Sequence, residues 1–232
     1  MDRIVQKKTL VEQVHDILED AICTGELSPG ERLNQDEIAA QLNVSRQPVN
    51  SAISLLKANG LVRDNGRRGV IVAEIDVEQF HSIYEFRSVV EPFAAGLAAE
   101  RVDVEAGSEA SDIMRAGNAA IAAQDIKGLL SADVQFHRMI YRWSGNHVIE
   151  ASMRANWPHM LRSMVEVLRD PVSARQSWDD HKRIADAMLA HDSVAAKETM
   201  ERHIGIAFEK TRKVLNRVAA SEPEAAASPA GV

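Results

Sequence analysis

The chain lacks both the cysteines that stabilise small secreted proteins and the apolar segments that anchor membrane proteins. Its 232 residues include a single cysteine, Cys23, so no disulfide can form within the chain. No apolar run approaches the roughly 20 residues of a membrane-spanning helix, and the opening MDRIVQKKTLVEQ contains no signal-peptide core. We therefore expect a soluble, cytoplasmic protein without membrane contact, in which Cys23 is a small buried side chain.

Aromatic residues, glycine and proline are also scarce. Aromatic side chains make up 4% of the chain, with 12 glycines and 7 prolines, whereas 45% of the residues are hydrophobic. Ala, Leu, Val and Ile supply most of these apolar residues, a composition that favours helices packed on helices. The length suits one large domain or two modest ones.

Positive charge is scarce overall but concentrated in one segment. The formal net charge is −7, so the whole chain does not resemble a nucleic-acid-binding domain, which is often basic. Residues 44–72 reverse this balance because they contain one acid, Asp64. Their basic residues are Arg46, Lys57, Arg63, Arg67 and Arg68.

The first 75 residues have the pattern of three helices followed by a hairpin. A helix is expected over residues 8–24, and a turn follows at Pro29-Gly30. A short helix over residues 34–42 is separated by the turn NVS from a helix that begins after Ser45 and stops at Gly60. The β-prone runs LVRD and VIVAE are joined by NGRRG, a strong hairpin signal. This order predicts a winged helix-turn-helix domain over residues 1–75.

The helix after Ser45 has an unusual polar face. Its apolar stripe is Val49, Ala52, Ile53 and Leu56, and its opposite face carries Arg46, Gln47, Asn50, Ser51, Ser54 and Lys57. This face contains hydrogen-bond donors and no carboxylate, which suits a recognition helix in the major groove of DNA, where acids would meet phosphates.

Each donor has an expected role on DNA. Arg46 can donate twice to guanine, and Gln47 or Asn50 can pair with adenine. Lys57 and backbone amides can bind phosphates. Ser45, at the start of the helix, is also predicted to contact DNA. Arg67 and Arg68, flanked by glycines at the hairpin tip, can approach the DNA backbone or the minor groove. The alternative is a protein-interaction module with a solvated arginine pair.

The segment GELSPGERLNQDEIAAQLNVSRQPVNSAISLLKANGLV resembles the N-terminal domain of the GntR family of bacterial transcription regulators. The shared pattern is a Pro-Gly-x-x-Leu turn, a Val-Ser-Arg-x-Pro-Val run and a final Gly-Leu-Val, and it covers most of residues 8–75. The family usually has Arg where this chain has Asn50, and often Glu where it has Ser51. The resemblance implies DNA binding, and the departure at Asn50 implies an operator that differs from the family norm.

From Asp76 onward, helix-period patterns predict an all-α helical bundle to residue 218. The expected helices span residues 77–100, 106–123, 125–143, 147–169, 174–191 and 193–218. Residues 219–232 are rich in Ala, Pro, Ser and Glu and are expected to be a disordered tail. The fold class is therefore mainly α, with a winged helix-turn-helix followed by a helical bundle.

Four polar residues are expected to meet inside this bundle. Asp133 and His137 are four residues apart and share one helix face. His181 and His203 each lie 11 residues from Asp192, at the break between two helices, so an antiparallel pair brings them to a similar height. One acid and three histidines suggest a divalent metal ion, with Zn²⁺, Ni²⁺ and Mn²⁺ all possible. A lone buried histidine is more often a hydrogen-bonded core residue.

Residues 76–218 resemble the all-helical ligand-binding domain (FCD type) of the FadR branch of the GntR family. The segments YEFRSVVEPFAAGLAAERV and SADVQFHRMIYRWSGNHVI carry this resemblance. It implies a metal bound by the Asp-x-x-x-His…His…His pattern, and an arginine at Arg87 that faces a pocket and grips an effector carboxylate. Asn146 is assigned to the same pocket, with a helix cap as the alternative. For Arg87, the alternative is a surface ion pair with Glu91.

Together these features predict a transcription regulator rather than an enzyme. A homodimer would place two recognition helices on an inverted repeat in double-stranded DNA, and a small organic or sugar acid bound near the metal would modulate binding. Repression is the commoner mode in the family. Two alternatives remain: a regulator for which the metal is itself the signal, and a metal-dependent hydrolase. The hydrolase lacks a further general base at a suitable spacing.

Overall fold

The structure, a computed structural model, describes residues 8–66, 69–103 and 106–221. It divides into two units, one formed by Met1–Asp76 with Ala151–Val165 and one by Val77–Glu150 with Glu166–Val232. Arg67 and Arg68 lie outside the described residues, as do residues 222–232. Among the described residues, no helix is long and apolar enough to cross a membrane.

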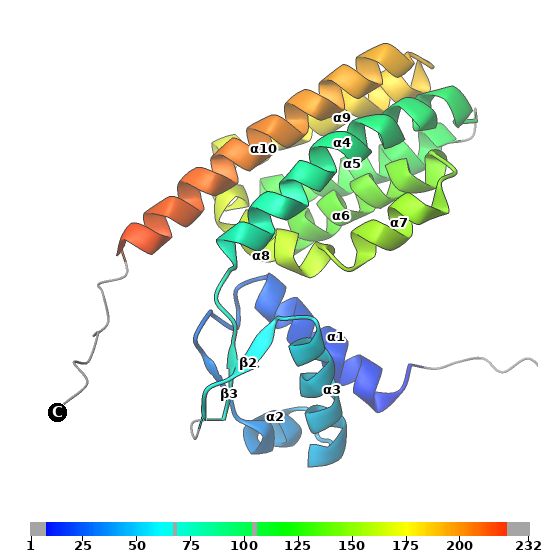
Figure 1. Ribbon diagram of the computed structural model, residues 1–232. Helices are drawn as coiled ribbons and strands as arrows, with labels where there is room; N and C mark the ends of the chain where they lie inside the picture. Colours follow the sequence, from blue (N-terminus) through cyan, green and yellow to red (C-terminus); the bar gives the residue numbers. More distant parts are fainter. Residues whose placement is uncertain (1–7, 67–68, 104–105, 222–232) are drawn as a thin grey trace, which may run out of the picture. The chain divides into compact units, whose positions relative to one another are not determined.

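The first unit contains the predicted helices and hairpin (Figure 1). Its elements are α1 (Leu10–Cys23), β1 (Arg32–Leu33), α2 (Gln35–Gln41), α3 (Arg46–Ala58), β2 (Val62–Asp64) and β3 (Val70–Val72). Thr9 begins α1 with a reciprocal capping box to Glu12, and Asn34 caps α2 by accepting from the Asp36 amide. Apolar residues from the helices and the sheet form one core.

The sheet has one strand more than the predicted hairpin. Its order is β1-β3-β2, with Arg32 opposite Ile71 in the antiparallel β1–β3 pair. The turn over LSPGERL therefore leads directly into a strand, and the Gly30 amide donates to the Val72 carbonyl at 2.9 Å. Periodicity could not reveal β1, because two residues are too few to show alternation.

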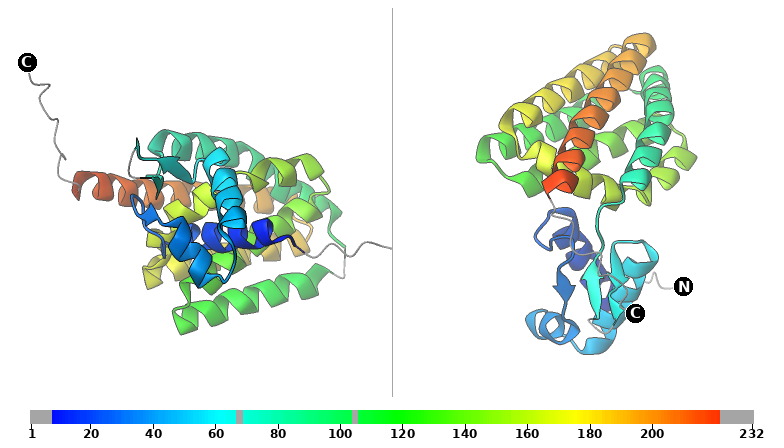
Figure 2. Two further views of the ribbon diagram at one scale, coloured as in Figure 1. Left: turned by 90° about the horizontal axis from the view of Figure 1, so that it is seen from below. Right: turned by 60° about the vertical axis from the view of Figure 1, so that its left-hand side comes forward.

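The elements that the structure describes after residue 76 are all helices. They are α4 (Val77–Arg101), α5 (Ala106–Ala123), α6 (Ile126–Trp143), α7 (His147–Arg154), α8 (Trp157–Leu168), α9 (Pro171–Leu189) and α10 (Ser193–Ser221). α10 lies along α4 and α9, and α5 lies against α6 and α9 (Figures 1 and 2). This arrangement brings the middle parts of α4, α6, α9 and α10 together.

Three predicted helix boundaries were wrong. The single helix expected over residues 147–169 is two helices, because Pro158 lacks an amide hydrogen and its ring would clash with the carbonyl of Arg154 in a continuous helix. α9 begins at Pro171 rather than residue 174, because Asp170 accepts from the Ser173 amide and proline suits the first helical position. α10 extends to Ser221, since the alanines that follow residue 218 favour helix.

The close packing of α5 on α9 gives a stability prediction. A Cβ at Gly117 would lie 1.9 Å from the Trp178 ring, whereas a Cβ at the helical Gly205 would meet nothing within 4 Å. We expect Gly117→Ala to destabilise the fold by about 1–3 kcal/mol through overpacking. Gly205→Ala should stabilise it by up to about 1 kcal/mol, since alanine favours helix. Urea unfolding followed by circular dichroism measures both, and equal shifts of the two variants would contradict the packing described.

Candidate functional site

Helix α3 presents the predicted DNA-contact residues to solvent. It buries Pro48, Val49, Ala52, Ile53 and Leu56. Arg46, Gln47, Asn50 and Lys57 are exposed on the other side, as is Ser45 at the N-cap. The Ser45 side chain makes no capping bond, and the first turn of α3 contains no acid. The positive end of this helix is therefore available to a phosphate or another anion.

Acids from neighbouring elements approach two of these donors. Arg46 Nε lies 3.0 Å from Asp36 Oδ1 on α2, and Lys57 Nζ lies 2.7 Å from Asp64 Oδ1 on β2. The donor face thus has no carboxylate from α3 itself, but carboxylates from α2 and β2 lie beside it. The sequence analysis did not predict these contacts. All four side chains are at least 41% exposed, and such exposed pairs contribute only about 0–1 kcal/mol. DNA can therefore replace the acids at little cost.

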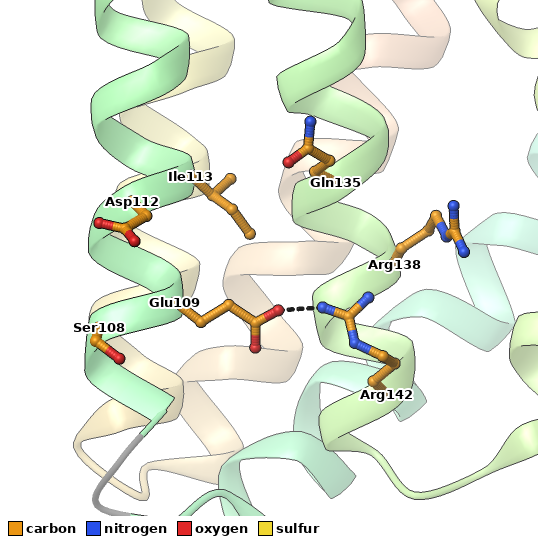
Figure 3. A pocket seen from close by; sticks show the side chains of 7 residues that line it. All are labelled: Ser108, Glu109, Asp112, Ile113, Gln135, Arg138 and Arg142. Carbon is orange, nitrogen blue, oxygen red and sulfur yellow. Dashed lines mark hydrogen bonds and ion pairs between the residues drawn. The ribbon is translucent and has the colours of Figure 1, made fainter.

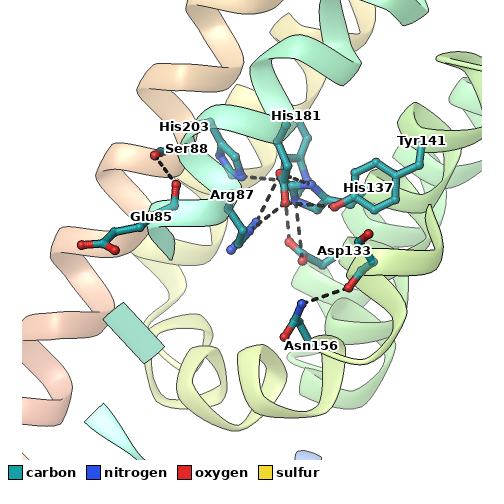
Figure 4. Close-up of polar contacts among 11 residues, drawn as sticks. Glu85, Arg87, Ser88, Asp133, His137, Tyr141, Asn156, His181 and His203 are labelled. Atoms are coloured by element: carbon teal, nitrogen blue, oxygen red, sulfur yellow. Dashed lines mark hydrogen bonds and ion pairs between the residues drawn. The ribbon is translucent and has the colours of Figure 1, made fainter. Parts of the chain in front are cut away.

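The four predicted metal ligands converge inside the second unit (Figure 4). Asp133 and His137 come from α6, His181 from α9 and His203 from α10, and all are buried. His181 Nε2 lies 3.2 Å from His203 Nε2 and 3.6 Å from Asp133 Oδ1. One nitrogen from each histidine lies within 4.8 Å of the others. The symmetry about Asp192 thus correctly predicted that His181 and His203 are neighbours.

The surroundings of the cluster keep the imidazoles of His181 and His203 neutral. Burial, reinforced by His137 and Arg87, lowers the pKa of His203 to about 3. Burial and the neighbouring His203 hold the pKa of His181 well below its usual range. Burial also raises the pKa of Asp133, whose Oδ2 has no hydrogen-bond partner among the described residues. The neutral imidazoles of His181 and His203, and an Asp133 oxygen without a hydrogen-bond partner among the described residues, fit a divalent cation, which needs deprotonated ligands.

Arg87 on α4 is fully buried beside this cluster and pairs with Glu91. Arg87 Nε donates to Glu91 Oε1 at 2.7 Å, and the guanidinium lies over the Tyr84 ring at 4.7 Å from its centroid. Arg87 Nη1 is buried without a hydrogen-bond partner among the described residues. The ion pair considered from the sequence therefore exists, but in the interior rather than on the surface. While Arg87 is paired with Glu91, its Nη1 can still donate a hydrogen bond to a ligand.

Two residues of the site were not recognised as such from the sequence. Glu91 Oε2 lies 2.9 Å from His137 Nδ1, and the Tyr141 hydroxyl donates to Glu91 Oε1 at 2.9 Å. Burial would raise the pKa of Glu91, but the Arg87 guanidinium, together with the His137 imidazole beside it, outweighs burial and lowers it. A signal was present, because Glu91 follows Arg87 and Tyr141 follows His137 by four residues, one helical turn along the same face.

Asn146 lies at a helix start. Its side-chain oxygen accepts from the Val148 amide at 3.1 Å, at the beginning of α7. Its backbone carbonyl also accepts from the Ile149 amide. Asn146 therefore caps a helix, which was the alternative prediction for this residue, and its side chain is used by that cap.

A separate open cleft of about 570 Å³ lies between α5 and α6 (Figure 3). Its arginines face acids, since Arg142 pairs with Glu109 and Arg138 lies 3.6 Å from Glu150. The cleft is lined by Ser108, Glu109, Asp112, Ile113, Gln135, Arg138 and Arg142. None of these was predicted from the sequence to form a site, and their charges are largely balanced.

Comparison with protein families identifies both domains. The family model described as "Bacterial regulatory proteins, gntR family" matches residues 10–72. The model of the FCD domain matches residues 82–205. The chain belongs to the GntR family of regulators with an FCD domain. The predicted family and fold class are therefore confirmed.

Curated relatives and solved structures agree with this assignment. An HTH-type regulator from an unstable DNA locus of Streptomyces ambofaciens is 28% identical over 89% of this chain and 85% of its own. A protein of Paenarthrobacter nicotinovorans, named a probable repressor of a D-xylose utilization operon, is 26% identical over 85% of this chain and 87% of its own. The solved structure of a GntR-type regulator from Rhodococcus sp. RHA1 superposes with a TM-score of 0.75 and is 26% identical in sequence. The match covers 88% of this chain and 97% of that chain. This GntR regulator is therefore a DNA-binding transcription factor and not an enzyme.

The exposed pair of Arg46 and Asp36 gives a prediction with an internal control. We expect Arg46→Ala to weaken binding to a selected operator by about 1–3 kcal/mol, roughly fivefold to 150-fold, because a base contact is lost. Asp36→Asn removes the competing carboxylate, so it should bind as tightly as the natural protein or more tightly. Fluorescence anisotropy at fixed salt measures both. If both variants bind like the natural protein, Arg46 does not contact DNA.

Proposed function

We propose that this GntR regulator is a homodimeric repressor that holds a divalent metal and responds to a small organic or sugar acid. The observation that carries the proposal is the buried cluster of three histidines and Asp133 beside an arginine with an unpartnered Nη1. Since bacterial operators lie in the cytoplasm, the protein would act there.

The metal would be held by Asp133, His137, His181 and His203. Three nitrogens and one oxygen suit Zn²⁺, Ni²⁺ or Mn²⁺, and an ion with more than four ligands would have positions left for an effector. A bound cation would also compensate the buried Asp133 carboxylate, whose desolvation is costly without a partner.

The effector's carboxylate would be bound by the metal and by Arg87. Arg87 Nη1 is a fixed charge-assisted donor in a buried setting, where such bonds are strong. Asn146 is left out of this site because its side chain caps α7. An acid that binds here would alter operator affinity only if the free and DNA-bound states hold it with different affinities.

A homodimer is proposed because an inverted repeat requires two recognition helices. Helix α4 offers a surface for the second copy. Phe86, Val89 and Phe93 are 39%, 72% and 52% exposed and lie along one side of this helix. Large exposed apolar stripes of this kind commonly mark protein contacts. Repression is favoured because one relative, from Escherichia coli, is named a transcriptional repressor and the Paenarthrobacter nicotinovorans protein is named a probable repressor.

The proposal is tested by release from a selected operator with a panel of hydroxy acids and sugar acids. We expect at least one acid to release the metal-loaded protein. Arg87→Lys should need roughly tenfold to a hundredfold more acid, because a charge-assisted hydrogen bond contributes about 1.5–3 kcal/mol. The matched control is Arg115→Lys, which changes an exposed arginine paired with Asp112.

Two results would contradict the proposal in different ways. If operator affinity followed free metal concentration and no acid had an effect, the protein would be a metal sensor. If Arg87→Lys released like the natural protein, the acid would bind elsewhere.

A further inference from the structure

Two hydrogen-bond donors and one imidazole nitrogen converge on one buried carboxylate at the centre of the second unit. Glu91 Oε1 accepts from Arg87 Nε at 2.7 Å and from the Tyr141 hydroxyl at 2.9 Å. Glu91 Oε2 lies 2.9 Å from His137 Nδ1. Glu91 and Arg87 are each 0% exposed, so both are removed from bulk solvent. Glu91 thus connects the proposed effector-binding arginine on α4 with a proposed metal ligand on α6.

The contact with His137 decides which imidazole nitrogen carries the hydrogen. A neutral histidine carries one hydrogen, on Nδ1 or on Nε2, and only the other nitrogen has a lone pair for a metal. A carboxylate facing Nδ1 keeps the hydrogen there and leaves the Nε2 lone pair available. His137 Nε2 lies 4.0 Å from Asp133 Oδ2, within the cluster. Such carboxylate–histidine contacts are known to orient metal ligands.

The contact with Arg87 fixes the guanidinium in the same way. With Nε on Oε1 and Nη2 3.4 Å from Oε2, the carboxylate occupies one side of the guanidinium. Nη1 is left as the donor without a hydrogen-bond partner in the described part of the chain. One acidic group therefore orients both the metal ligand and the effector donor.

We propose that Glu91 is the positioning residue of this site: it holds His137 in the Nδ1–H tautomer required for metal binding and orients Arg87 toward the effector. The inference rests on the proposed metal site. It has a specific chemical requirement, because all three groups around Glu91 are donors and a carboxylate is an acceptor only. Glutamine has nearly the same shape but one acceptor oxygen and an NH₂ group. In Glu91→Gln, at least one donor would face another donor.

The first experiment reads the tautomer in the unaltered full chain. Protein labelled with ¹⁵N at histidine is compared with a His137→Gln variant to assign the signals, both after chelator treatment and after loading with Zn²⁺. We expect His137 to carry its hydrogen on Nδ1 in both states. A hydrogen on Nε2 in the chelator-treated protein would overturn the inference without any substitution at Glu91.

The second experiment measures Zn²⁺ and Ni²⁺ affinity by competition with a chromophoric chelator. Glu91→Gln should weaken both affinities by roughly tenfold to a hundredfold, as expected when such a partner is lost. The matched control is Glu85→Gln, the same change at an exposed position of α4, which should leave them unchanged. Tyr141→Phe removes one donor and keeps the carboxylate, so it should weaken affinity by less than Glu91→Gln. Circular dichroism establishes that each variant is folded.

The possible outcomes separate this inference from the proposed function. If the natural chain binds neither metal, the proposed metal site fails. If the natural chain binds metal and folded Glu91→Gln binds equally well, the metal site stands and the role of Glu91 fails. Should Glu91→Gln not fold, the tautomer in the natural chain and the affinity of Tyr141→Phe decide.

Discussion

The buried ion pair of Arg87 and Glu91 is the interaction on which the second unit depends. Both side chains are removed from water at the meeting point of α4, α6, α9 and α10. A buried charge is tolerated only with a close counter-charge and further hydrogen bonds, and removing one partner typically costs about 3–5 kcal/mol. The positions of His137 and Tyr141 follow from this constraint, because both approach the Glu91 carboxylate.

The same constraint relates stability to regulation. The cluster combines one guanidinium, two carboxylates and three imidazoles from four helices (Figure 4), so any cation or acid that binds there interacts with several helices at once. A ligand with different affinities for two arrangements of these helices changes their populations. The DNA-binding unit needs no such burial. Its predicted contact residues on α3 are exposed, and the acids that pair with Arg46 and Lys57 are exposed as well, so these ion pairs are weak.

The sequence predicted those features that follow from local spacing. The apolar stripe of α3, the pairing of His181 with His203 about Asp192 and the shared face of Asp133 and His137 all depend on helical periodicity, and the structure contains each of them. The spacing of Arg87 and Glu91 was visible in the sequence, but the burial of this pair and the contact of Asp36 with Arg46 depend on how one helix packs against another, which periodicity within a single helix does not contain. The break between α7 and α8 had a local signal, Pro158 itself. The apolar pattern over residues 147–169 nevertheless led to the prediction of a single helix.

X-ray absorption spectroscopy of the protein as purified, at the edge of whichever metal it retains, shows directly whether the buried histidines bind a metal ion. We expect one metal ion per chain, bound by three imidazoles and at least one oxygen. His203→Gln should lose one imidazole signal. Absence of retained metal, or a first shell of oxygens without imidazole, would show that the buried histidines are core residues. The control is His159→Gln, which changes a histidine bonded instead to the Asn59 carbonyl.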